Sequence, residues 1–136
     1  MTVIIAHRGS AGTHPENTLP AFMQAVRTGA DGIELDVHLT ADQQLVVIHD
    51  ESVDRTTDGK GFIRELTLEE IKALDAGSWF DEKYQATKIS TLQEVLNLLL
   101  QMRFRGVLCI EIKTNKYHYP GIEEKISNVM TSKEWP

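Results

Sequence analysis

The sequence predicts an α/β fold, and more narrowly an incomplete TIM barrel, the (β/α)8 arrangement of parallel strands surrounded by helices. Short apolar runs that suit buried strands alternate with segments of helical periodicity. Polar side chains follow the carboxyl ends of these strands, which is where such barrels carry their sites. A closed barrel typically needs about 250 residues, whereas this chain has 136. We therefore expect a single domain, 1–136, that contains only part of a barrel.

The first three elements are predicted to be a strand, a helix and a strand. Residues 3–6 form a short β-prone run that suits a strand buried on both faces. Asn17 or Thr18 can cap the helix that follows. Residues 32–40 alternate strictly, with apolar side chains on one face and polar ones on the other. This order predicts a right-handed parallel βαβ unit.

A hairpin is predicted next. Residues 45–48 read as a strand, but only 41–44 separate them from the previous one, which is too short for a parallel crossover. A turn centred on 42–43 would place Asp36 directly opposite His49.

Two capped helices, a strand and a last helix complete the pattern. Thr67 and Glu70 form a capping box, and Ser90 or Thr91 caps the next helix. Residues 107–113 form a strand that alternates Cys109, Glu111 and Lys113 with apolar side chains, and a helix follows Gly121.

Composition narrows the classes of function. The formal net charge is −6 and the pI is near 5.3, so we expect no nucleic-acid partner and no anionic membrane surface. The single cysteine, Cys109, lies in an apolar run and is expected to be a buried thiol in a reducing environment. Without a leader pattern or an apolar run of spanning length, we expect a cytoplasmic protein with no stable membrane insertion.

Three carboxylates carry the strongest chemical signal. Glu34, Asp36 and Glu111 sit within apolar strands, where uncompensated charge is unfavourable. Oxygen ligands from two strands favour a hard divalent cation such as Mg²⁺ or Ca²⁺. In the alternative interpretation, Glu34 and Glu111 only form ion pairs with Arg8 and Lys113.

Two histidines follow strands near the predicted acidic cluster. His7 and His49 can exchange protons near neutral pH, as cleavage of a phosphodiester requires. Arg8 can bind a phosphate through two hydrogen bonds, and Lys113 can act as a point charge. The other three histidines, His14, His38 and His118, are expected to be bystanders.

Six motifs in series span most of residues 4–113. They are His7-Arg8-Gly9, Glu16-Asn17-Thr18, Glu34-Leu35-Asp36-Val37, His49-Asp50, Arg55-Thr56-Thr57 and Glu111-Ile112-Lys113. In order and spacing, this set resembles the glycerophosphodiester phosphodiesterase family.

The resemblance implies a barrel of the type found in phospholipase C-like phosphodiesterases, of which this chain is the N-terminal part and lacks the C-terminal part. Residues from about 39 to 88 correspond to a small insertion over the barrel mouth. The implied reaction splits a small-molecule glycerophosphodiester into glycerol 3-phosphate and an alcohol through a cyclic phosphate.

The resemblance also assigns roles to individual residues. His7 and His49 are the acid and base, and Arg8 and Lys113 contact the phosphate, with Glu16 as a supporting residue. The divalent ion lies on three carboxylates, those of Glu34, Asp36 and Glu111.

Two alternative functions stay open at this point. The chain is a phosphodiesterase of lysophospholipids, or a truncated, non-catalytic fragment that binds a divalent ion or phosphate. The open edges of a half-barrel also favour self-association.

Overall fold

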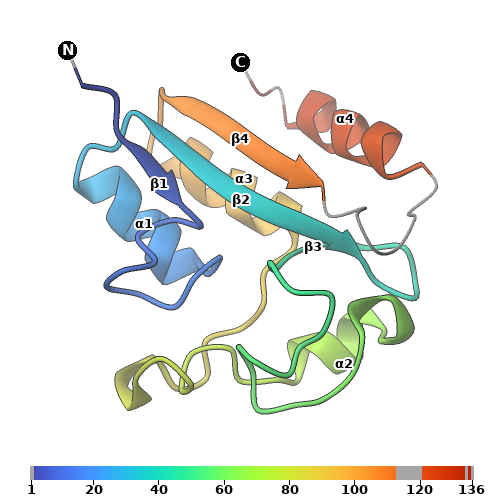
Figure 1. The fold of residues 1–136 in the computed structure, drawn as a ribbon. Coiled ribbons are helices and arrows are strands. Elements are labelled where there is room, and N and C mark those ends of the chain that lie inside the picture. Colours follow the sequence, from blue (N-terminus) through green and yellow to red (C-terminus); the bar gives the residue numbers. More distant parts are fainter. Residues whose placement is uncertain (1, 113–120, 134, 136) are drawn as a thin grey trace.

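The computed structural model describes residues 2–112, 121–133 and 135 (Figure 1). Within these described residues, four strands form one sheet, and four α-helices and two short 3-10 helices lie between and beside them. In chain order these elements are β1 (Ile5–His7), α1 (Leu19–Arg27), β2 (Gly32–Leu39), β3 (Leu45–Val47), η1 (Ile63–Glu65), α2 (Leu68–Lys72), η2 (Glu82–Tyr84), α3 (Leu92–Gln101), β4 (Val107–Ile112) and α4 (Ile122–Ser132).

Strand β2 is the centre of the sheet. Its first half pairs in parallel with β1 and its second half pairs antiparallel with β3, so these two short strands share one edge of β2. Strand β4 pairs in parallel along the other edge, with Asp36 opposite Glu111. The predicted parallel βαβ unit is thereby confirmed.

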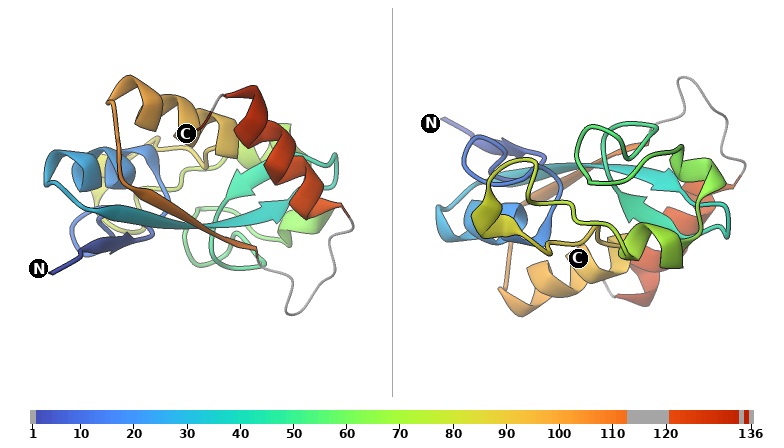
Figure 2. Two further views of the ribbon diagram at one scale, coloured as in Figure 1. Left: turned by 90° about the horizontal axis from the view of Figure 1, so that it is seen from above. Right: turned by 90° about the horizontal axis from the view of Figure 1, so that it is seen from below.

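One face of the sheet carries the main core. The apolar side chains of β2 are fully or almost fully buried, and they pack with Phe22 of α1 and Leu96 of α3. Helices α1, α3 and α4 lie together on this face (Figure 2). The alternation of β2 therefore leaves Glu34 and Asp36 on the opposite face, as predicted.

A second, smaller core lies beside the first. Val46 and Ile48 point into it, whereas Leu45 and Val47 point into the main core. The second core also contains buried side chains of the segment between β3 and α3, namely Val53, Ile63, Ile71, Ala76 and Ile89. Because successive side chains point to opposite sides, this one strand contributes residues to both cores.

The predicted register of the hairpin is wrong by one residue. Val37 pairs with Val47, and the Asp36 carbonyl accepts a hydrogen bond from the backbone of Ile48 rather than standing opposite His49. The connecting loop has three residues instead of two. Its last residue, Gln43, adopts a left-handed φ of 65°, as is common in three-residue hairpin loops.

Two burial predictions at the sheet edges are also wrong. Strand β1 is shorter than predicted, and Val3 and Ile4 are exposed in front of it. Cys109 is exposed as well, since it lies on the face of β4 that carries Glu111, away from the three helices.

The predicted capping box of α2 is present, and so is the predicted cap of α3, which is Thr91. Thr67 accepts a hydrogen bond from the backbone N–H of Glu70, and Thr91 does so from that of Glu94. None of the helices within the described residues combines the length and the apolar character that crossing a membrane requires.

Candidate functional site

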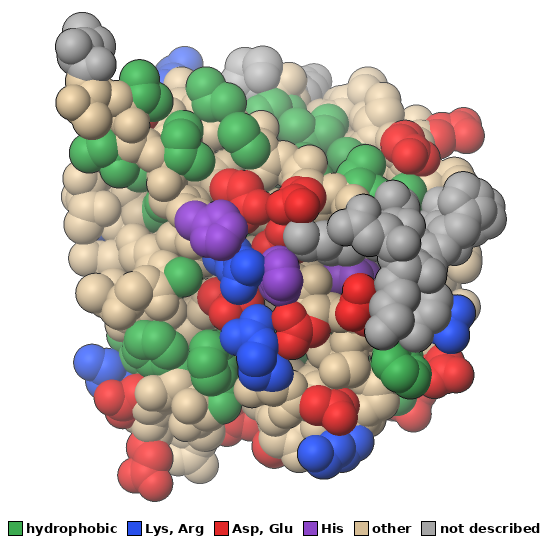
Figure 3. All heavy atoms as spheres, viewed as in Figure 1, with side chains coloured by type: hydrophobic (Ala, Val, Ile, Leu, Met, Phe, Trp, Pro, Cys, Tyr) green, Lys and Arg blue, Asp and Glu red, His purple; other side chains and the backbone are tan. Residues whose placement is uncertain are grey.

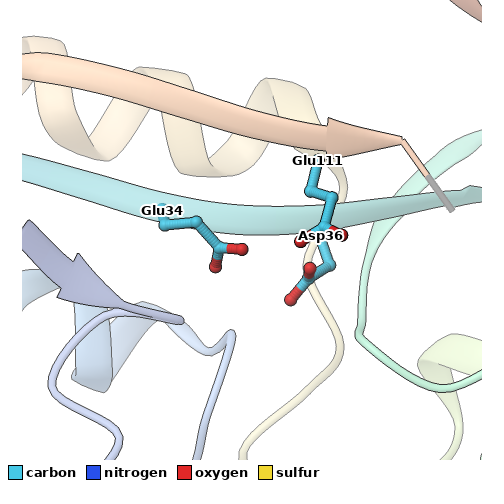
Figure 4. Close-up of side chains that lie close together, drawn as sticks. All are labelled: Glu34, Asp36 and Glu111. Carbon is cyan, nitrogen blue, oxygen red and sulfur yellow. The ribbon is translucent and has the colours of Figure 1, made fainter.

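The three predicted metal ligands lie together. Glu34 and Asp36 project from β2 and Glu111 from β4, all on the face opposite the helices (Figure 4). One carboxylate oxygen of each lies within 4.8 Å of those of the other two. Asp36 is fully buried, the Glu34 side chain is 15% exposed, and Glu111 is exposed. The cluster therefore opens to solvent on the Glu111 side.

The electrostatics of this cluster favour a bound cation. Burial, together with the negative charge of Asp36 and contact with Glu111, raises the pKa of Glu34 to about 7. A hard divalent cation offsets such repulsion, and an all-oxygen donor set suits Mg²⁺ or Ca²⁺. The donor set and its geometry therefore fit a divalent ion.

The alternative interpretation, an ion pair between Glu34 and the Arg8 side chain, is wrong. The Arg8 guanidinium lies 3.1 Å from Glu16 and 3.6 Å from Asp36, and only the backbone N–H of Arg8 donates to Glu34. The other predicted phosphate contact, Lys113, lies outside the described residues, as does His118.

A strained turn brings Arg8 to the cluster. Arg8 and Gly9 both have left-handed φ angles, of 55° and 75°. A Cβ on Gly9 would lie 2.8 Å from the backbone of Ala21, so only glycine fits there. The chain then returns so that the Asn17 backbone donates to the Arg8 carbonyl, and the Asn17 side chain donates to Asp36 at 3.0 Å.

The two predicted histidines stand at different depths. His7 ends β1, and its side chain is 66% exposed, with Nε2 4.0 Å from Glu34. His49 follows β3 and is 31% exposed, and its Nδ1 lies 2.8 Å from Asp50. The His49 imidazole is thus in contact with a carboxylate partner.

Arg55 connects the two acids that support these groups. It forms two hydrogen bonds with Glu16 and two with Asp50, at 2.9–3.1 Å. This contact with Arg55 is the main reason why the pKa of Asp50 falls to about 2. Figure 3 shows histidine, basic and acidic side chains gathered in the middle of one face.

Residue-based reasoning missed several of these supports. Asn17 was predicted only as a helix cap, and Arg55 stood out only within a motif. His38, predicted to be a bystander, is fully buried, and its Nε2 lies 3.0 Å from the carbonyl of His49. The sequence signal for this role was that His38 alternates onto the same strand face as Asp36.

The Trp79 and Phe80 side chains pack against each other. Their rings meet edge to face with centroids 5.7 Å apart, and the Arg55 guanidinium lies 5.9 Å from the centroid of the Trp79 ring. His14 contacts Thr13 and the ring of Tyr84 instead.

One face of the sheet therefore combines an acidic cluster, two imidazoles and a guanidinium. Such a set has the parts needed to neutralise a phosphate, move protons and orient an ester.

Comparisons with known proteins give a consistent result. The model of the glycerophosphoryl diester phosphodiesterase family matches residues 7–133. A glycerophosphodiester phosphodiesterase of Caldanaerobacter subterraneus subsp. tengcongensis is 57% identical over 125 residues, which cover 92% of this chain and 51% of the relative. One of Bacillus altitudinis is 52% identical over 126 residues, 93% of this chain and 51% of the relative.

A solved structure agrees with these relatives. It is an Oleispira antarctica phosphodiesterase in complex with the product sn-glycerol-3-phosphate, 39% identical, with a TM-score of 0.86 over 100% of this chain and 54% of that one. The chain spans about half the length of the curated relatives it matches.

The fold class predicted from the sequence, an incomplete N-terminal part of a TIM barrel, is confirmed by this similarity. The match between the family model and the residues that build the site leads to one conclusion. The chain belongs to the glycerophosphoryl diester phosphodiesterase family.

Proposed function

We propose that this chain carries the catalytic residues for metal-dependent hydrolysis of glycerophosphodiesters to glycerol 3-phosphate and an alcohol. The observation that carries the proposal is the convergence of Glu34, Asp36 and Glu111 on the face that also presents His7 and His49. The product bound to the Oleispira antarctica relative supports glycerol phosphate esters as the substrate class.

The two histidines account for the proton transfers. One imidazole removes the proton from a free glycerol hydroxyl, whose oxygen then attacks phosphorus. The other imidazole protonates the alcohol oxygen as its bond to phosphorus breaks, which leaves a cyclic phosphate. Water then opens this ring with the two roles exchanged, so both histidines return to their starting states. No activated serine or cysteine is needed, because the substrate supplies the first nucleophile.

The charged side chains would position the substrate during these steps. Arg8, whose guanidinium lies between Glu16 and Asp36, would contact the phosphate. Lys113 is assigned the same role from the family resemblance, and Glu16 supports Arg8. The three carboxylates would hold the ion, Mg²⁺ or Ca²⁺, which supplies positive charge against the phosphoryl oxygens.

The predicted organisation belongs to the same proposal. Residues 1–136 would form one domain, with about 39–88 as a small insertion over the barrel mouth. The exposed Val107 on β4 and Ile5 on β1 make self-association through the open edges a prediction. A cytoplasmic location stays a prediction as well.

The test is release of glycerol 3-phosphate from glycerophosphocholine by the 136-residue chain, with Mg²⁺ or Ca²⁺ and with EDTA. We expect turnover with metal and none with EDTA. His7→Ala and His49→Ala should abolish turnover and leave metal binding intact. His14→Ala is the matched control and should keep turnover.

Other results would select the alternatives. Metal binding without turnover in any buffer would indicate a non-catalytic fragment. Choline release from lysophosphatidylcholine that exceeds turnover of glycerophosphocholine would indicate the lipid substrate. Turnover that resists EDTA would contradict the role of the metal.

A further inference from the structure

Arg55, a loop residue, makes four charge-assisted hydrogen bonds with two carboxylates. Its Nη1 and Nη2 donate to the two oxygens of Glu16 at 3.0 and 2.9 Å. Its Nε and Nη2 donate to the two oxygens of Asp50 at 2.9 and 3.1 Å. One guanidinium thus forms a two-point contact with each of two carboxylates, which is the geometry that gives such pairs their directional strength.

The surroundings of Arg55 fix its position. The loop before and after it is closed by a hydrogen bond from the Val53 backbone to Gly61 at 2.9 Å, and by one from the Thr57 hydroxyl to the Val53 carbonyl at 2.6 Å. Val53 is fully buried. On the side of the guanidinium, the Trp79 ring is itself oriented by a 3.0 Å bond from Nε1 to the Ala76 carbonyl. The guanidinium is therefore placed before any ligand binds.

The two carboxylates that Arg55 holds contact different residues of the site: Asp50 contacts His49, and Glu16 contacts Arg8. Asp50 Oδ1 contacts both Arg55 and Nδ1 of His49, so the carboxylate cannot rotate without losing bonds on both sides. Glu16 Oε2 contacts both Arg55 and Arg8. Arg8 has a second anionic neighbour in Asp36 at 3.6 Å, whereas Asp50 is the acid in contact with the His49 ring.

We infer that Arg55 is a positioning residue for His49: it fixes the Asp50 carboxylate, which keeps the proton of neutral His49 on Nδ1 and leaves Nε2 to act on the substrate. This inference rests on the proposed function for its catalytic consequence, but the arrangement of the ring can be measured without any turnover. His38, whose Nε2 lies 3.0 Å from the His49 carbonyl, contacts the backbone of His49.

The two contacts of Arg55 predict an asymmetric effect. Without Arg55, Glu16 still receives the Arg8 guanidinium at 3.1 Å, so the group that holds the phosphate stays in place. Asp50 loses its two bonds with Arg55 and keeps only the contact with the His49 ring. The effect should therefore fall on the proton transfer step, and hence on kcat rather than on KM.

The test compares Arg55→Gln, Arg55→Lys and the control Lys60→Gln, which removes one positive charge from an exposed position in the same segment. The first measurement is the tautomer of His49, from the ring ¹⁵N shifts of the metal-loaded chain at pH 8. The second is kcat and KM for glycerophosphocholine. Arg55→Lys keeps the charge but cannot form two two-point contacts, and it carries the test if Arg55→Gln fails to fold.

We expect the wild type and Lys60→Gln to show the Nδ1–H tautomer of His49. Both Arg55 variants should show a mixture, with kcat reduced about 10- to 100-fold, a part of what a positioned general base contributes, and with KM within about twofold. Wild-type ring shifts in both Arg55 variants would overturn the inference, and so would an increase in KM at unchanged kcat. Absence of turnover in the wild type would count against the proposed function alone, because the tautomer measurement would still decide the role of Arg55.

Discussion

Binding of a divalent ion should depend steeply on pH below neutrality, because Glu34 must lose a proton to become a ligand. Burial and the neighbouring acids raise the pKa of Glu34 to about 7, from an ordinary value of 4.5. A raised pKa means that the neutral carboxyl persists to higher pH, and protons then compete with the ion for the site.

The size of the effect follows from that value. With a pKa of about 7, about one tenth of the Glu34 side chains are ionised at pH 6 and about nine tenths at pH 8. The affinity for Mg²⁺ or Ca²⁺ should therefore fall about tenfold from pH 8 to pH 6. With the ordinary value of 4.5, the change would be only about 3%.

Isothermal titration calorimetry of the metal-free chain at the two pH values measures this directly. Repetition in buffers of different ionisation enthalpy should count about one proton released per ion at pH 6 and almost none at pH 8. His7→Gln is the control for the neighbouring imidazole, whose Nε2 lies 4.0 Å from Glu34. A pH-independent affinity, or a pH dependence that disappears in His7→Gln, would refute the reasoning.

Three further predictions concern the stability of the chain. In the metal-free chain, thermal stability should fall as pH rises from about 4.5 to about 7, because the folded state holds a proton on Glu34 that the unfolded state has lost, and a divalent ion should reduce this fall in a melting experiment. Phe22→Ala should lower the free energy of unfolding in urea by about 3–5 kcal/mol because Phe22 is fully buried, whereas Phe62→Ala, at a side chain that is 40% exposed, should change it far less. Thr91→Ala removes the cap of α3 and should lower the free energy of unfolding by about 1 kcal/mol, and an unchanged urea midpoint would contradict that assignment.

The alternation of β2 was predictable because it follows from covalent geometry. Successive side chains of a strand point to opposite faces, so Glu34 and Asp36 had to share a face once Leu35 between them entered the core. The sequence placed Glu111 in the same cluster but did not predict its position opposite Asp36. That position depends on how β4 docks along β2, and no local pattern fixes that.

The register of the hairpin shows where local rules fail. A turn of two residues was the simplest solution, but Gln43 takes a left-handed φ that its residue type does not favour. The Thr40 hydroxyl accepts a hydrogen bond from the Gln44 backbone at 2.9 Å, which helps to close the longer loop. One additional loop residue moves His49 away from the position opposite Asp36.

The supports of the site were the least predictable part. Arg55 and Glu16 are 39 residues apart in the chain, and composition gives no sign of such a contact. The exposure of Cys109 likewise depends on which elements cover the sheet, not on the apolar run that contains it. Residue types and spacing thus identified the groups that do chemistry, whereas only the fold identifies the groups that hold them.

The claim on which the proposed function depends is that Glu34, Asp36 and Glu111 bind one divalent ion together. Crystals of the chain grown with Mn²⁺, a hard cation with an anomalous signal, test it directly. We predict one strong anomalous peak within about 2–2.6 Å of an oxygen from each of the three carboxylates. A map with no anomalous peak at these carboxylates, from crystals grown at saturating Mn²⁺, would contradict the claim.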